Sequence, residues 1–237
     1  MKKHIVLFIC LFLVIEIQAQ NIVGAWEGSH TSDKGEEIKT IVVFAEGFQV
    51  MTQFHAETGK FIMTNGGAWK LDGDTMTEFI EFDTASPDRV GTEVSFKVTI
   101  KENEMGIVGE KMKLKRIDAG KPGKLQGAWL MSGRIRNGKT QTRDTSRPRK
   151  TMKILSGTRF QWIAYNIATK QFMGTGGGTY TTIDGKYTEN IEFFSRDDSK
   201  AGISLGFDYS FVDGNWHHKG FSSKGDAMHE IWSTRQK

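Results

Sequence analysis

The chain contains the same pattern twice, and this internal repeat restricts its fold more than any other feature. Residues 77–82 (TEFIEF) return as residues 188–193 (TENIEF), and Gly24-Ala25-Trp26 returns as Gly127-Ala128-Trp129. Two more pairs keep the same order along the chain: residues 48–50 with 160–162, and residues 64–69 with 175–180. A repeat of this length indicates one structural module per copy. We therefore predict two modules, residues 21–118 and 125–237, joined by a polar linker at residues 119–124.

Tight turns separate short alternating runs in both modules. Asp184-Gly185 in the second module, and Gly73-Asp74 at the same place in the first, each lie between two such runs, which is typical of a two-residue β-hairpin. Asp213-Gly214 marks a further hairpin. No helical period of useful length is present. Strands spaced in this way predict an all-β fold of two tandem antiparallel β-barrels, with β-sandwiches as the alternative.

The ends of each module carry a resemblance to a known family. Each module opens with Gly-x-Trp on its first strand and finishes with a strand that carries an arginine, Arg116 or Arg235. This arrangement resembles the lipocalins, or calycins, and residues 176–194 resemble a lipocalin-like family of exported bacterial proteins. The resemblance implies that the tryptophan closes the barrel floor and that the late arginine packs over it. It also implies a ligand cavity inside the barrel.

The first twenty residues have the pattern of a secretory signal peptide. Lys2 and Lys3 precede an apolar run, residues 5–15, which is too short to span a membrane, and small residues follow near the expected cleavage site. We expect an exported protein, periplasmic or secreted, without a transmembrane segment. The single cysteine, Cys10, lies inside the removed segment, so no disulfide is expected. The net charge of +3 that remains does not indicate a nucleic-acid partner.

Strand alternation predicts which polar side chains point inward. The turn at Asp184-Gly185 places Tyr180 opposite Glu189, and the turn at Gly73-Asp74 places Trp69 opposite Glu78. Both modules then put a glutamate on an apolar face. The two predicted inward sets are Tyr180, Thr182, Tyr187, Glu189, Ile191 and Phe193 in the second module, and Trp69, Leu71, Met76, Glu78, Ile80 and Phe82 in the first. A buried carboxylate needs a partner, which we expect for Glu189 to be a tyrosine, His218 or an arginine.

The hairpin at Asp213-Gly214 adds His218, beside Tyr209, to the interior of the second module. The first module has no counterpart to this histidine, so the second is predicted to hold the working cavity. Its expected ligand-binding residues are Trp162, Tyr180, Tyr187, Glu189, Tyr209, Trp216, His218 and Glu230. His217 and His218 are adjacent on one strand and point to opposite faces, so neither a metal site nor a cofactor is predicted.

A basic segment, residues 134–150, follows the strand that bears Trp129. Its arginines Arg143, Arg147 and Arg149 are predicted to form a lid that attracts an anionic ligand, with a solvated loop as the alternative.

Three functions remain open from the sequence. The leading hypothesis is an exported protein that binds a small hydrophobic or amphipathic molecule, with a polar or anionic end, in a barrel cavity. The second is a barrel enzyme, an isomerase, lyase or hydrolase, that uses Glu189 and His218 as acid and base. The third is a structural surface module whose barrels are filled.

Overall fold

The computed structural model describes residues 22–121 and 123–236, so the predicted signal peptide lies outside the described residues. The chain forms two antiparallel β-barrels, as the sequence predicts, and not sandwiches. Among the described residues, no helix has the length and apolar character needed to cross a membrane.

The first barrel is closed and its strands neighbour one another in chain order, with the last strand pairing with the first. The strands are β1 (Gly24–Thr31), β2 (Glu37–Ala45), β3 (Phe48–His55), β4 (Phe61–Asp72), β5 (Thr75–Asp83), β6 (Glu93–Lys101), β7 (Glu104–Ile107) and β8 (Lys113–Asp118). A short 3₁₀ helix, η1 (Pro87–Arg89), connects β5 to β6.

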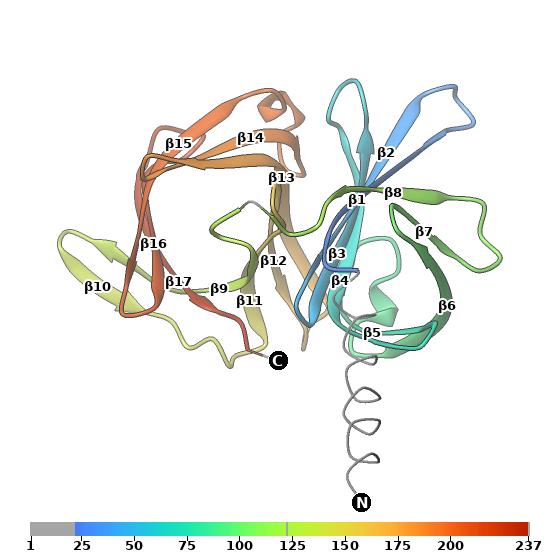
Figure 1. Ribbon diagram of the computed structural model, residues 1–237. Coiled ribbons are helices and arrows are strands. Elements are labelled where there is room, and N and C mark those ends of the chain that lie inside the picture. Colours follow the sequence, from blue (N-terminus) through green and yellow to red (C-terminus); the bar gives the residue numbers. More distant parts are fainter. Residues whose placement is uncertain (1–21, 122, 237) are drawn as a thin grey trace, which may run out of the picture.

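The second barrel repeats this order and is closed by pairing of β17 with β9. Its strands are β9 (Gly127–Arg136), β11 (Arg149–Leu155), β12 (Arg159–Asn166), β13 (Gln171–Ile183), β14 (Lys186–Phe194), β15 (Ser204–Val212), β16 (Asn215–Phe221) and β17 (Ala227–Thr234). An additional short strand, β10 (Lys139–Thr142), folds back on β9 and projects away from the first barrel (Figure 1). A 3₁₀ helix, η2 (Asp198–Lys200), connects β14 to β15.

The predicted hairpins have the expected register. Tyr180 lies opposite Glu189 and Tyr209 lies opposite His218, because the turns at Asp184-Gly185 and Asp213-Gly214 each contain two residues. The first strands are equivalent as well: the indole Nε1 of Trp129 donates to the carbonyl of Leu125 at 2.9 Å, and Trp26 makes the same bond to Ile22.

A β-bulge in each barrel reverses the faces at one end of the hairpin. The pairing shifts between Gly66 and Gly67, and again between Gly177 and Gly178. A Cβ on Gly178, whose φ is +159°, would come within 2.0 Å of a backbone carbonyl, so only glycine fits. The prediction that Phe82 and Phe193 point inward is therefore wrong. Both lie on the outer wall, in a hydrophobic cluster shared by the two barrels.

The register also corrects one pair in the repeat. Phe48 pairs with Ala68, whereas its structural counterpart Arg159 pairs with Thr179. The sequence alignment of Phe48 with Phe160 is thus displaced by one residue, and Phe160 corresponds to Gln49. Similar residue letters favoured the wrong alignment. The displacement matters because neighbouring strand residues point to opposite faces, so a shift of one residue exchanges inward and outward positions.

The two late arginines differ in their roles. The guanidinium of Arg116 lies 4.0 Å from the ring centre of Trp26, as the lipocalin resemblance implies. Arg235 instead reaches the first barrel, where it lies 3.9 Å from the ring centre of Phe48 and pairs with the buried Glu81. The expectation that Arg235 packs over the first-strand tryptophan of its own module is therefore wrong, since β17 ends one residue before it.

The barrels lie side by side and share a hydrophobic cluster built mainly from β2 and β3 of the first and β11 and β12 of the second (Figure 1). Phe54 stacks on Phe193, with ring centres 4.9 Å apart, and Phe82 packs on Tyr165 at 4.8 Å. Phe54 corresponds to Tyr165 in the repeat, and Phe82 to Phe193. The two contacts are therefore related by an approximate two-fold axis, as in a symmetric dimer.

Polar bonds fix the two barrels against each other. The side chain of Gln161 accepts from Thr52 at 2.7 Å and donates to Thr64 at 3.1 Å, across the contact. At the end of β8, the carboxylate of Asp118 accepts bonds from the turn between β11 and β12, including one from the hydroxyl of Thr158 at 2.6 Å. These bonds hold the connection between the barrels in place.

Candidate ligand-binding site

Glu189, the glutamate predicted inside the second barrel, is buried and has two partners. Its carboxylate accepts from the ammonium of Lys153 at 2.7 Å and from the hydroxyl of Tyr187 at 2.9 Å. Lys153 is 3% exposed and was not recognised in the sequence as an inward residue. Tyr180 lies opposite but donates to the carbonyl of Ser156 instead.

His218 lies in the same interior but has a different partner. Its Nδ1 is 3.4 Å from the carboxylate of Glu230, and its Nε2 is buried without a hydrogen bond among the described residues. Burial and the nearby charge of Lys153 lower the pKa of His218. Burial opposes the charge of Glu230, but the bond from His218 and the charge of Lys153 bring the pKa of Glu230 below its ordinary value.

Aromatic side chains occupy the interior of the second barrel. Trp216, Trp232 and Tyr187 are each no more than 1% exposed and pack around the ammonium of Lys153 at 5.1–5.2 Å. Of the residues predicted to bind a ligand there, only Glu230 lines one of the cavities described below. The prediction of an acid–base pair gains no support from this geometry, because Glu189 and His218 are held by other partners and line none of these cavities.

The interior of the first barrel contains a cavity of about 480 Å³. Its wall is mainly apolar and rich in methionine, and most strands of the barrel contribute to it. The lining consists of Thr40, Val42, Phe44, Gln49, Met51, Gln53, Asn65, Met76, Glu78, Arg89, Phe96, Val98, Met105, Gly106, Ile107, Glu110, Met112 and Leu114. The volume is in the range of small-molecule binding sites.

The repeat explains why this cavity is in the first barrel. At the positions of Tyr187, Trp216 and Trp232, the first barrel carries the smaller side chains Met76, Met105 and Leu114. Val42 and Gln49 likewise replace Lys153 and Phe160. The two barrels share their backbone plan, so the loss of large side chains leaves space. The prediction that the second module holds the cavity rested on its polar residues and did not consider side-chain volume.

Two polar groups face the apolar wall without a partner. Gln49 is 1% exposed, and its amide Nε2 is buried with no hydrogen-bond partner among the described residues. Glu78 makes no hydrogen bond or ion pair with any described residue, and burial raises its pKa to about 7 despite the positive charge of Arg89. An unmet donor in an apolar cavity is costly unless a ligand or water satisfies it.

Charged residues also border this cavity. Arg89, at the end of η1, lines it and donates to Asp83 at 3.1 Å, and Glu110 contributes a second, exposed carboxylate. With its charge already paired, Arg89 does not make the cavity strongly attractive to anions.

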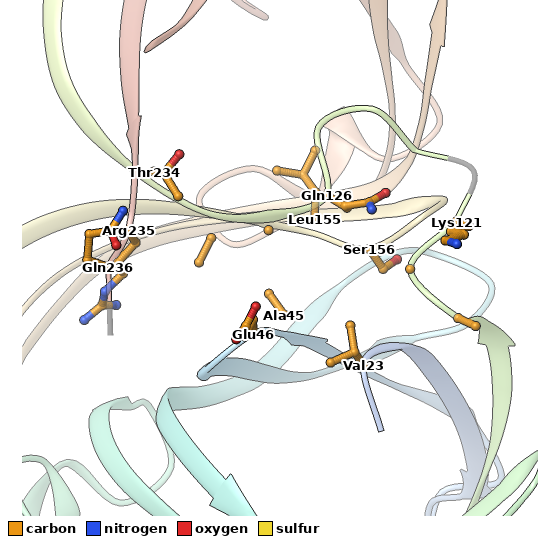
Figure 2. Close-up of a pocket in the computed structure, with 14 residues that line it drawn as sticks. Val23, Ala45, Glu46, Lys121, Gln126, Leu155, Ser156, Thr234, Arg235 and Gln236 are labelled. Atoms are coloured by element: carbon orange, nitrogen blue, oxygen red, sulfur yellow. The ribbon is translucent and has the colours of Figure 1, made fainter. Parts of the chain in front are cut away.

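A separate groove of about 510 Å³ lies between the barrels (Figure 2). Figure 2 shows Val23 and Ala45 of the first barrel on one side, and Leu155 and Gln126 of the second on the other. Much of its lining is backbone and small side chains near the connection, and Arg235 at its far end is already paired with Glu81. The groove follows from the packing of two rounded surfaces, and none of the described residues that line it has a buried side-chain nitrogen or oxygen without a partner.

The three arginines of the predicted basic lid have different surroundings and partners. Arg143 is half-buried and lines a pocket of about 200 Å³ with Glu230. Arg147 is exposed and pairs with Asp144, whereas Arg149 donates to the sulfur of Met173 at 3.4 Å.

His217 and His229 approach each other on the second barrel, with ring nitrogens 3.0 Å apart. Within the described part of the chain, no third histidine, cysteine or carboxylate joins them to form a group able to hold a metal ion.

The partly buried Glu78 of the first barrel predicts a dependence of stability on pH. The folded chain keeps the Glu78 proton up to a pKa of about 7, while the unfolded chain loses it near 4.5. The free energy of unfolding should therefore fall as pH rises through this window and level off above it. Glu78→Gln should remove this slope and stabilise the protein at alkaline pH by up to about 3 kcal/mol.

Urea unfolding at acidic and alkaline pH measures this effect, and Glu110→Gln provides a control that removes an exposed carboxylate at the same cavity. An unchanged slope in Glu78→Gln would show that Glu78 keeps an ordinary pKa.

Comparison with known proteins concerns the second barrel. Residues 124–236 match a family model described as Domain of unknown function (DUF4488), and the match contains β9 to β17. A comparison with curated proteins finds no match. The second barrel is thus similar to a family whose function is unknown.

Proposed function

We propose that the protein is an exported binding protein that holds a small, largely apolar molecule in the cavity of its first barrel. The observation that carries this proposal is a cavity of about 480 Å³ with an apolar wall and an orphaned amide donor, Gln49. Methionine side chains are flexible and polarisable, so Met51, Met76, Met105 and Met112 suit a wall that adapts to its ligand.

The polar groups indicate the chemistry of the ligand's polar end. The Nε2 group of Gln49 donates, so it fits a carbonyl, ether or hydroxyl oxygen. Glu78, whose pKa is raised to about 7, can donate or accept near neutral pH. A neutral oxygen-bearing end therefore fits better than an anionic one, since Arg89 is already paired with Asp83.

The lipocalin resemblance and the export of the protein are parts of this proposal. An eight-stranded barrel in chain order, with Arg116 over Trp26, supports the resemblance. The first twenty residues support export. Fractionation of producing cells, with N-terminal sequencing of the purified protein, tests the second part: a start near Gln20 or Asn21 is expected, and an intact first segment in the cytoplasm contradicts it.

The second barrel supports a structural role for its own interior. Its tryptophans and the Lys153–Glu189 pair fill the space that is empty in the first barrel. We infer that one barrel binds while the other provides a rigid partner.

A cavity-filling substitution tests the binding proposal. Met105→Trp places in the first barrel the side chain that the second carries at Trp216. We expect it to weaken binding of a neutral apolar probe, N-phenyl-1-naphthylamine, by at least about tenfold. The reason is that the larger indole side chain takes up cavity space that the probe would otherwise occupy. The probe's fluorescence in a titration measures this affinity.

The control is Ile183→Trp, which adds the same side chain at an exposed position of the second barrel. It should leave affinity unchanged. Met76→Phe provides a second filling variant if Met105→Trp does not fold. Undiminished probe binding in a folded filling variant would place the binding site elsewhere.

A further inference from the structure

The pocket of about 200 Å³ in the second barrel concentrates positive charge, and the proposed ligand site does not include it. It lies where three parts of the chain meet: β9, β17, and the segment that follows β10. Its lining consists of Met131, Arg134, Ile135, Arg136, Arg143, Thr151, Ala227, Met228, His229 and Glu230.

Three arginines line this pocket, and they come from two segments of the chain. Arg134 and Arg136 are two residues apart on β9, so they share a face of the strand. Arg143 comes from the segment between β10 and β11. Its backbone N–H donates to Ser132 at 2.7 Å, and its guanidinium donates to the hydroxyl of Thr151 at 3.2 Å. The third arginine is therefore held over the pocket by bonds to neutral groups.

The positive charge in this pocket is only partly balanced. Burial and the nearby charges of Arg149 and Arg134 lower the pKa of Arg143, and Glu230 acts in the opposite direction. Glu230 is the one acid in the lining, and its carboxylate is already bonded to His218. Arg134 and Arg136 form no ion pair with any described residue. Arginines gathered in this way repel one another, and a bound anion relieves that repulsion.

We propose that this pocket binds the phosphate group of a small molecule or of free phosphate. Guanidinium forks match the oxygens of a tetrahedral oxyanion and can bind two of them at once. The pocket volume suits a group of that size rather than a large ligand. Residues 30–33 of the first barrel, the corresponding end of β1 and the turn after it, contain no arginine or lysine, so the site belongs to the second barrel alone.

Calorimetric titration of the full mature chain with inorganic phosphate tests this site, with chloride matched for ionic strength. We expect saturable binding that weakens by at least about tenfold in the double variant Arg134→Gln/Arg143→Gln. The control Arg147→Gln removes a nearby exposed arginine outside the lining and should change affinity by less than about twofold. Thermal melts without phosphate check that each variant folds.

A parallel titration with phenyl phosphate separates the two sources. Tighter binding than for inorganic phosphate identifies a phosphate monoester as the occupant, and equal affinity identifies free phosphate. Two results overturn the proposal: no phosphate binding by the unaltered chain, or an equal loss in Arg147→Gln, which would indicate diffuse surface attraction. Binding of N-phenyl-1-naphthylamine should remain unchanged in all these variants, so failure here is separate from failure of the first-barrel site.

Discussion

Lys153→Met is expected to destabilise the protein by about 3–5 kcal/mol, because it leaves the carboxylate of Glu189 buried without its cation. Both side chains are nearly inaccessible, at 4% and 6% exposure, so water cannot replace the lost partner. Tyr187 still donates to Glu189 but supplies no positive charge. Urea unfolding followed by tryptophan fluorescence measures the loss.

The double variant Lys153→Met/Glu189→Gln should recover most of the stability, since it removes the buried charge altogether. Lys186→Met is the matched control: this lysine pairs with Asp208 on the surface of the same barrel, and its loss should leave the free energy of unfolding nearly unchanged. A single variant as stable as this control would show that the buried pair contributes nothing.

Phe54→Ala is expected to cost about 3–5 kcal/mol, although Phe54 lies on the outer wall of its barrel. Its ring is 2% exposed and stacks on Phe193 of the other barrel, so truncation leaves a void between the two. Both barrels should lose stability together. Unfolding followed by circular dichroism and by fluorescence should still give one transition at a lower denaturant concentration.

Phe221→Ala is the control for this substitution, because Phe221 is 63% exposed on the second barrel. It should change stability by less than about 0.5 kcal/mol. Two separate transitions in the Phe54→Ala protein would mean that the barrels unfold independently.

The hairpins could be predicted from the sequence because their turns are local signals. Asp184-Gly185 and Asp213-Gly214 fix the register over the residues next to them, and Glu189 and His218 lie inside as that register requires. The fold class followed from the repeated pattern of such turns.

The outward position of Phe193 was missed because the glycine run does not show between which residues a bulge shifts the pairing, and that shift at Gly177 and Gly178 reverses the faces beyond it. Lys153 was missed for a related reason. Met152 and Ile154 face the other barrel, so β11 is buried on both faces and lacks alternation. A strand apolar on both sides is a signal of such double burial, and it could have indicated an inward lysine.

The cavity of the first barrel was not predicted, because its origin is a difference in side-chain volume between the two barrels. The presence of Met105 at the position that corresponds to Trp216 is informative only when the two modules are aligned correctly. The one-residue displacement at Phe160 hid the replacement of that ring by Gln49. A comparison of inward positions, once the strand pairs are known, finds the space directly.

The short connection between the barrels makes their two-fold contact independent of protein concentration and lets the two halves differ in sequence. Two separate copies would come apart on dilution, whereas residues 119–126 keep this contact intramolecular at any concentration. In a pair of identical subunits, a smaller core residue would appear in both and weaken both. Here the first barrel can carry Met105 while the second barrel keeps Trp216 at the corresponding position. The hollow barrel can thus depend on its solid neighbour for stability, and its interior can change while the neighbour's stays as it is.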